Sequence, residues 1–287
     1  MGDSELKGLL DSMGIGRREF LAGATVAAGY ALAAQPVSAE VIATPAEGLT
    51  EGMTIIFSAG TPVPAYSARP AAGSNWPVVL VVQEIFGVHE HIKDLCRRLA
   101  RQGYLAVAPE LFVRQGDPKT LPDIPSIVQT IVPKVPDAQV LADLDAAADW
   151  AVARGGDPGR IAATGFCWGG RIVWLYAARS ARLKAGVAWY GRLAGPVTDN
   201  APRHPVDVAA ELKAPVLGLY GGADPSIPAD SIEAMRAALA AAGKEAEIVV
   251  YPEAPHGFNA DYRPSYRKEP AEDGWRRLLD WLKRHGV

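Results

Sequence analysis

Residues 165–170 read Gly-Phe-Cys-Trp-Gly-Gly, between an apolar stretch at 160–164 and a segment of helical character that begins just after Cys167. Glycines around a nucleophile at a strand-to-helix turn are typical of a nucleophile elbow, here with cysteine where serine is usual. Side chains at the flanking positions would prevent the tight turn. The helix N-terminus would present N–H groups and its positive dipole end to Cys167, which favours a thiolate and a developing oxyanion. The alternative is a buried structural cysteine.

The segments on either side of this turn alternate between strand and helix patterns. Apolar runs predict strands at 53–57, 63–67, 77–83, 104–108, 160–164, 183–189, 215–220 and 246–251. Helical spacing predicts helices at 89–101, 140–154, 228–242 and 271–284, besides the one after the elbow. The first two strands form an antiparallel hairpin, and long loops span 112–136 and 191–215. Such alternation predicts an α/β fold, with a mostly parallel, doubly wound sheet flanked by helices in three layers.

A nucleophile needs a base and a group that orients the base, in the chain order nucleophile, acid, histidine for this architecture. Asp224 follows the predicted strand 215–220, and His256 follows the predicted strand 246–251. Both therefore fall at the carboxyl edge of the sheet, where ligands of open α/β folds bind. Taken singly, Asp224 could cap the next helix and His256 could be an ordinary loop histidine. Their order after Cys167 favours a Cys-His-Asp triad.

Five short motifs together resemble the dienelactone hydrolase family, the carboxymethylenebutenolidases. In chain order they are Gln-Glu-Ile-Phe-Gly at 83–87, Ala-Pro-Glu-Leu-Phe at 108–112, the elbow at 165–170, Tyr-Gly-Gly-Ala-Asp at 220–224 and His-Gly-Phe at 256–258. The resemblance extends from about residue 50 to the C-terminus. It implies an α/β-hydrolase fold, hydrolysis of a lactone ring, and a triad on Cys167, His256 and Asp224.

The resemblance also implies roles for five further residues. Glu84 matches a glutamate that lies beside the resting thiol until substrate displaces it, which protects the thiol from oxidation. The backbone amides of Ile85 and Trp168 would form the oxyanion hole. Arg114 matches an arginine that binds the substrate carboxylate, and a guanidinium fork suits that planar group. Phe112 stands near it in the substrate site.

The chain departs from the family pattern at three places. The family's second carboxylate-binding arginine corresponds to Ala260, and the nearest arginine is Arg263. Phe112 replaces a tyrosine, and Trp168 is bulkier than the usual aliphatic residue. These differences bear on the identity of the substrate more than on the hydrolytic chemistry.

The N-terminal segment predicts an export signal. Arg17-Arg18 precedes an apolar run of small residues at 22–34, and Val37-Ser38-Ala39 ends it. This order of basic, apolar and cleavage regions is typical of a signal peptide, and the paired arginines indicate the twin-arginine (Tat) export machinery as a partner. The alternative is an amphipathic helix packed on the body. We expect cleavage after Ala39, a single domain at 40–287, a periplasmic or secreted protein, and no stable membrane anchor.

Charge and cysteine content exclude several functional classes. The chain has 287 residues, with 29 basic and 32 acidic side chains and a formal charge of −3, so it lacks the basic footprint of a nucleic-acid-binding protein. Two cysteines are too few for a disulfide-dense scaffold or a four-thiolate metal site. Cys96 falls on the apolar face of helix 89–101 and is expected to be a buried filler.

The histidines outside the triad predict no metal site. His89 and His91 are two residues apart, so they would not share a helix face, and no third ligand is spaced nearby. His89 closely follows the Glu84 segment, which predicts contact with the rim of the pocket. His204 lies between Pro202 and Pro205 and is expected on the loop surface.

These observations predict a hydrolase that cleaves a small-molecule ester or lactone through an acyl-thioester intermediate. The reaction calls for no cofactor and no metal, and we expect a monomer. Alternatives are a general short-chain carboxylesterase, and a catalytically silent protein of the same fold that binds a ligand or partner. A redox protein that cycles Cys96 and Cys167 is a third, against which the helical position of Cys96 argues.

Overall fold

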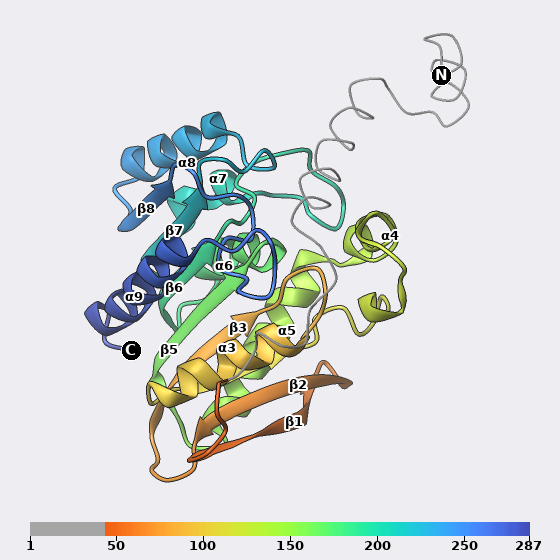
Figure 1. The fold of residues 1–287 in the computed structure, drawn as a ribbon, viewed down its shortest axis with the longest axis vertical. Helices are drawn as coiled ribbons and strands as arrows, with labels where there is room; N and C mark the ends of the chain where they lie inside the picture. Colours follow the sequence, from red (N-terminus) through yellow and green to blue (C-terminus); the bar gives the residue numbers. More distant parts are fainter. Residues whose placement is uncertain (1–43) are drawn as a thin grey trace.

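An eight-stranded sheet runs through residues 44–287, the part of the chain that this computed structural model describes. Its order is β1-β2-β4-β3-β5-β6-β7-β8 (Figure 1). The strands are β1 (Leu49–Ser58), β2 (Thr61–Pro70), β3 (Trp76–Val82), β4 (Leu105–Pro109), β5 (Gly156–Phe166), β6 (Leu183–Trp189), β7 (Val216–Gly221) and β8 (Ala246–Tyr251). β2 pairs antiparallel with both β1 and β4, and all other neighbours are parallel. The predicted mostly parallel sheet is confirmed.

Helices cover both faces of the sheet. In Figure 1, α3 (Glu90–Arg101) and α9 (Lys268–Arg284) lie in front of the strands, and α5 (Asp137–Val152) and α6 (Trp168–Arg179) lie behind them. α8 (Ala229–Ala241) connects β7 to β8. The predicted three-layer arrangement is therefore confirmed. No helix within residues 44–287 combines the length and the hydropathy that a membrane crossing requires.

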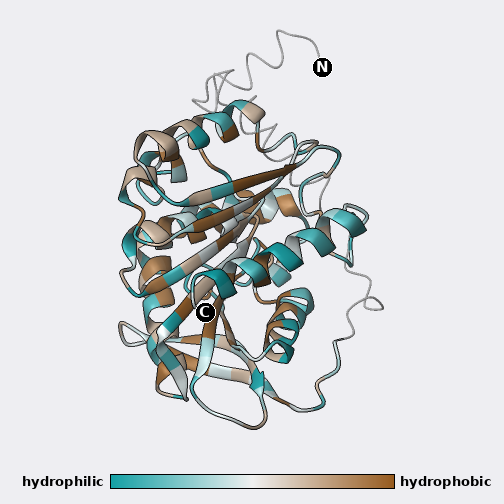
Figure 2. Cartoon of the chain, turned by 90° about the vertical axis from the view of Figure 1, so that its left-hand side faces the viewer, coloured by the Kyte–Doolittle hydropathy of each residue, from teal (hydrophilic) through white to brown (hydrophobic). Residues whose placement is uncertain are grey.

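The central strands are buried on both faces, as their continuous apolar runs predict. Residues 78–82 of β3 are fully inaccessible to solvent, and so is most of β4 and β6. Figure 2 shows hydrophobic residues, in brown, along the strands, and hydrophilic residues, in teal, distributed over the helices. Hydrophobic burial on both sides fixes the sheet, so the carboxyl ends of its parallel strands form a rigid edge.

Two helices lie in segments where the sequence predicts loops. α4 (Ile124–Thr130) lies within 112–136, and the short α7 (Pro205–Val208) lies within 191–215. The prolines suggested broken structure, but proline is tolerated in the first helical turn, where its missing N–H would have no partner. Asp123 caps α4 by accepting a hydrogen bond of 2.8 Å from the Ser126 amide. The predicted signal peptide at 1–39, with its cleavage site, lies outside the described residues.

Candidate active site

The three predicted triad residues come together at the carboxyl edge of the sheet. Cys167 directly follows β5, Asp224 follows β7 by three residues, and His256 lies in the loop after β8. All three are buried, with exposed fractions of 3%, 4% and 5%. Because β5 to β8 are parallel and their ends are neighbours, segments far apart in the sequence converge here.

Cys167 occupies a strained turn. Its backbone has φ 58° and ψ −117°, a conformation that non-glycine residues rarely adopt and that clusters at functional sites. Its amide donates a 3.0 Å hydrogen bond to the Trp189 carbonyl of β6, which holds the turn in place. A Cβ at Gly165 would collide with the Gly169 carbonyl oxygen, and one at Gly169 with carbonyls that end β3. The glycines are therefore required by close backbone packing.

His256 is held by a carboxylate. Its Nδ1 lies 2.6 Å from Asp224 Oδ2, and Ser226 holds the other carboxylate oxygen through its amide at 2.8 Å and its hydroxyl at 2.5 Å. Burial alone would raise the pKa of Asp224, but His256 and Ser226 keep it below its ordinary value. The ionised carboxylate fixes the imidazole so that Nδ1 faces Asp224.

Opposing effects set the protonation of His256. Burial lowers its pKa, but the charges of Asp224 and Cys167, and hydrogen bonds to both, raise it to about 10. The imidazole therefore carries a proton near neutral pH and contacts the Cys167 sulfur.

The two residues predicted to supply the oxyanion hole, Ile85 and Trp168, line the same cavity. Trp168 is the first residue of α6, so its N–H is among the amides that have no partner within the helix. Ile85 comes from the loop after β3 and is 1% exposed. The Phe112 ring packs edge-on against the Trp168 ring, with ring centroids 4.7 Å apart.

Glu84 is buried in a cluster of donors. Its Oε2 accepts a 3.2 Å hydrogen bond from the Tyr262 hydroxyl and lies 3.3 Å from His89 Nε2 and 3.5 Å from Arg263 Nη2. Burial alone would raise the pKa of Glu84, but Arg263 and His89 lower it well below the usual range, so the carboxylate is ionised. Arg263 also acts electrostatically on Cys167, which places the cluster next to the thiol. His89 thus lies beside Glu84, and its contact with the rim of the pocket stays a prediction.

The rings of His89 and His91 stack at 6.1 Å, contrary to the expectation that residues two apart point to different sides. His89 is the N-cap of α3 and has extended backbone, so the helical rule does not apply to it. Within residues 44–287, no group of three or more histidine, cysteine, aspartate or glutamate side chains is arranged to hold a metal ion.

Arg114 forms a two-pronged ion pair inside the protein. Its Nη1 and Nη2 lie 2.7 and 3.0 Å from the carboxylate oxygens of Asp143 on α5. The Asp143 carboxylate thus binds the Arg114 guanidinium where the resemblance expects the substrate carboxylate to bind. The role of Arg114 in substrate binding stays a prediction. Ala260, at the position of the family's second arginine, is fully buried.

The expectation for His204 is wrong. Its side chain is 3% exposed, accepts a hydrogen bond at Nδ1 from Arg171 Nε at 3.3 Å, and donates from Nε2 to the Pro196 carbonyl at 2.9 Å. Arg171 in turn forms a two-pronged pair with Asp137, both distances being 2.7 Å. The flanking prolines suggested a surface loop, but this buried polar cluster satisfies the histidine inside.

Three residues at the site were missed or passed over. Ser226 stands two residues after Asp224 in Asp-Pro-Ser, a pattern typical of an Asx turn, so the sequence did carry a signal for it. Tyr190 has φ 37°, packs edge-on against His256 at 5.1 Å, and its buried hydroxyl has no hydrogen-bond partner within the described chain. Arg263 was noted in the sequence only as the arginine nearest to Ala260. No strand or helix pattern relates its position to that of His256.

Cys96 lies apart from this site. It is fully buried on α3, burial strongly raises the pKa of its thiol, and both cysteines are free. The expectation that Cys96 fills the apolar helix face agrees with this environment.

Comparison with known proteins identifies the family. The model for the "Dienelactone hydrolase family" matches residues 63–286. A Methylorubrum extorquens protein named "Putative carboxymethylenebutenolidase" is 58% identical and covers 99% of this chain and 98% of its own length. An Escherichia coli protein of the same name is 58% identical over 91% of this chain and 97% of its own.

A solved structure agrees with these sequence matches. The crystal structure titled "Putative Dienelactone Hydrolase" from Klebsiella pneumoniae has a TM-score of 0.81 and 62% identity, covering 82% of this chain and 98% of that one. The predicted resemblance and the α/β-hydrolase fold are therefore confirmed. The chain belongs to the dienelactone hydrolase family of carboxylic ester hydrolases.

Proposed function

We propose that this hydrolase cleaves a small-molecule ester or lactone through a Cys167-His256-Asp224 triad. The observation that carries the proposal is the position of His256, which is held at 2.6 Å by Asp224, is protonated near neutral pH, and contacts Cys167 at the N-terminus of α6. This arrangement supplies a nucleophile, a proton donor and an orienting carboxylate in one place.

In the acylation step, the Cys167 thiolate attacks the carbonyl carbon and the carbonyl π electrons move to oxygen. The amides of Ile85 and Trp168 stabilise that oxyanion. The oxyanion then collapses, the bond to the ester oxygen breaks, and His256 gives its proton to the leaving alkoxide. In a lactone, this opens the ring and leaves the alcohol attached to the acyl chain.

In the deacylation step, neutral His256 takes a proton from water as the water oxygen attacks the thioester. A second oxyanion forms in the same hole and collapses, which expels the thiolate and yields the carboxylic acid. Asp224 holds the imidazole during both transfers. These steps regenerate the thiolate that attacked the substrate and the imidazolium that gave up its proton.

Two further roles belong to this proposal. The negative charge of Glu84 disfavours a thiolate at Cys167 in the resting enzyme. The ion pairs of Glu84 with Arg263 and His89 support the assignment of Glu84 to a place beside the thiol. Arg114 and Phe112 contribute to the substrate site, with Asp143 competing for the guanidinium. A Glu84→Gln variant should react faster with iodoacetamide than the wild type, and an unchanged or slower rate would contradict this role.

The central experiment compares Cys167→Ala with Cys96→Ala on p-nitrophenyl acetate and on a dienelactone. We expect kcat/KM to fall at least about a thousandfold for Cys167→Ala, because the nucleophile is lost. Cys96→Ala should keep its turnover, and Cys167→Ser should be much slower than the wild type. Full residual turnover by Cys167→Ala would refute the nucleophile. An inert wild type whose Cys167 resists iodoacetamide would indicate a silent binding protein.

We also propose that the chain is exported through the twin-arginine route and cleaved after Ala39, leaving a periplasmic domain at 40–287. The support is the order of Arg17-Arg18, the apolar run at 22–34 and the small residues at 37–39. An Arg17→Lys, Arg18→Lys double variant should stay in the cytoplasmic fraction. N-terminal sequencing of the wild type from periplasm should begin at Glu40, and a start at Met1 or Gly2 would contradict cleavage.

A further inference from the structure

A cavity of about 220 Å³ adjoins the candidate oxyanion hole. One side is formed by Ile85 and Trp168, and the others by two loops at 128–137 and 192–204. Asn200 joins the loops: its side-chain amide donates to the Pro133 carbonyl at 2.8 Å, and its own carbonyl accepts from the Asp137 amide at 2.8 Å. Hydrogen bonds therefore join the two segments that line the cavity.

Most of the cavity wall is apolar. Besides Ile85 and Trp168, it presents Val128, Val132, Pro133 and Val135. Such a surface suits a hydrocarbon segment, because contact with it removes apolar area from water. The rest of the lining contains three basic polar groups, two arginines and a histidine, and also the carboxylate of Asp137.

Two of those three polar groups are already committed to the protein. Arg171 binds Asp137 through both guanidinium ends at 2.7 Å and donates to the Arg203 carbonyl at 2.6 Å. His204 donates to one backbone carbonyl and accepts from Arg171, so its ring is neutral and fully used. Neither group offers a free positive charge to a ligand.

Arg192 is different. It lines the same cavity, is half-buried, and forms no hydrogen bond or ion pair with any residue of the described chain. Its guanidinium lies near Gly195 and close enough to His204 to act on that ring electrostatically. A partly desolvated cation without a counter-charge is costly, and an anionic ligand would offset that cost.

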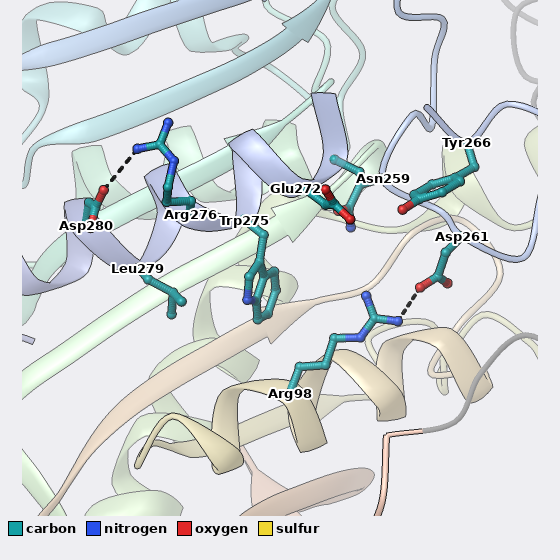
Figure 3. A pocket seen from close by; sticks show the side chains of 10 residues that line it. Arg98, Asn259, Asp261, Tyr266, Glu272, Trp275, Arg276, Leu279 and Asp280 are labelled. Carbon is teal, nitrogen blue, oxygen red and sulfur yellow. Dashed lines mark hydrogen bonds and ion pairs between the residues drawn. The ribbon is translucent and has the colours of Figure 1, made fainter. Parts of the chain in front are cut away.

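The larger groove between α3 and α9 provides the contrast (Figure 3). There, Arg98 reaches Asp261 and Arg276 reaches Asp280, so each of these guanidinium groups already has a carboxylate partner within the groove. Because both arginines are already paired with carboxylates, they do not need an anionic ligand to balance their charge. Uncompensated positive charge next to the reacting centre distinguishes the Arg192 cavity.

We propose that Arg192 binds a carboxylate carried by the substrate, while the apolar walls hold the hydrocarbon segment between that carboxylate and the scissile carbonyl. A single guanidinium balances one negative charge and matches the two oxygens of a planar carboxylate. The inference deepens the proposed function and rests on it. It assigns substrate selection to Arg192, a residue on the loop after β6 that the sequence motifs do not include.

The test measures kcat/KM for two substrates that differ in one charge, the p-nitrophenyl ester of adipic acid with its other carboxyl free and the corresponding methyl ester. A second pair places the carboxylate or its methyl ester on the alcohol side. Wild type should prefer the charged member of at least one pair, and Arg192→Gln should lower that preference about tenfold to a hundredfold. Arg192→Gln should therefore lower kcat/KM more for the charged ester than for the neutral one, and Arg192→Lys should restore part of the preference.

Arg203→Gln is the matched control, because Arg203 belongs to the same loop but is exposed and paired with Glu211. It should leave the preference unchanged. The inference is wrong if wild type turns over charged and neutral esters equally, or if the preference survives Arg192→Gln and disappears in Arg114→Gln. No turnover of any ester by wild type would refute the proposed function itself, so the two failures are distinguishable.

Discussion

Replacing Asp224 by asparagine tests the electrostatics of the triad most directly. The substitution keeps the size of the side chain but removes the charge 2.6 Å from His256 Nδ1. A pKa of about 10, against an ordinary value of 6.5, means that the site favours the imidazolium by about 5 kcal/mol more than water does. Asp224 is the largest of the contributions that raise this pKa, so at least half of that preference should disappear.

In the Asp224→Asn variant, burial should dominate and the pKa of His256 should fall toward or below 6.5. Between pH 7 and 9, wild type then carries an imidazolium where the variant carries a neutral ring. Losing half to all of about 5 kcal/mol corresponds to roughly a hundredfold to a thousandfold or more in kcat/KM. Ser226→Ala is the control, because it removes a hydrogen bond to Asp224 but leaves the carboxylate charge, and its effect should be much smaller.

The assay is an NMR titration of the His256 ring, combined with the pH profile of ester hydrolysis. A raised folded-state pKa contributes stability that is fully present below the unfolded value near 6.5 and is lost as pH rises through about 10. The difference in free energy of unfolding between wild type and Asp224→Asn should therefore shrink above pH 7. A wild-type ring that titrates near 6.5, or a variant ring that titrates like the wild type, would refute the reasoning.

Three further predictions concern stability. Asp137→Asn should cost about 3–5 kcal/mol in urea unfolding, because it leaves the buried Arg171 guanidinium unpaired, whereas Asp149→Asn in an exposed pair should cost less than about 0.5 kcal/mol. Cys96→Ala should lower the free energy of unfolding by about 1–2 kcal/mol through a small cavity, and mass spectrometry should find no alkylation of native Cys96 by iodoacetamide. Gly165→Ala should lower the melting temperature or prevent folding, because its Cβ would collide with a backbone carbonyl of α6, and a wild-type melting temperature would show that the elbow tolerates a side chain.

The convergence of the three candidate triad residues could be predicted because they lie close to strand ends. Cys167, Asp224 and His256 each follow a strand within a few residues, and parallel strands align their carboxyl ends. Apolar runs identify the strands, so a strand pattern and a short motif together place each side chain at the same edge. Glu84 and Ile85 were assigned through the family resemblance, and they lie in the segment that follows β3.

Contacts between long loops could not be predicted in this way. The burial of His204 depends on Arg171, which is on α6, and on a carbonyl of its own loop, and neither is linked to it by strand or helix periodicity. Arg114 was expected to face the substrate, but whether it does depends on Asp143 of α5, which lies in a separate part of the chain. Local sequence patterns determine backbone conformation, whereas these pairings depend on how loops pack.

This division between strand ends and loops bears on specificity. Cys167 lies in a turn whose backbone is tightly packed, since added atoms at Gly165 or Gly169 would meet backbone. The cavity beside it is built from loop side chains, and substitutions at 128–135 or at Arg192 would alter its charge and volume without touching the triad. We therefore expect relatives with the same elbow, aspartate and histidine to differ in substrate mainly through these two loops. Exchange of residues 128–135 between two such enzymes should change the preferred acyl length while the pH profile set by His256 and Asp224 stays the same.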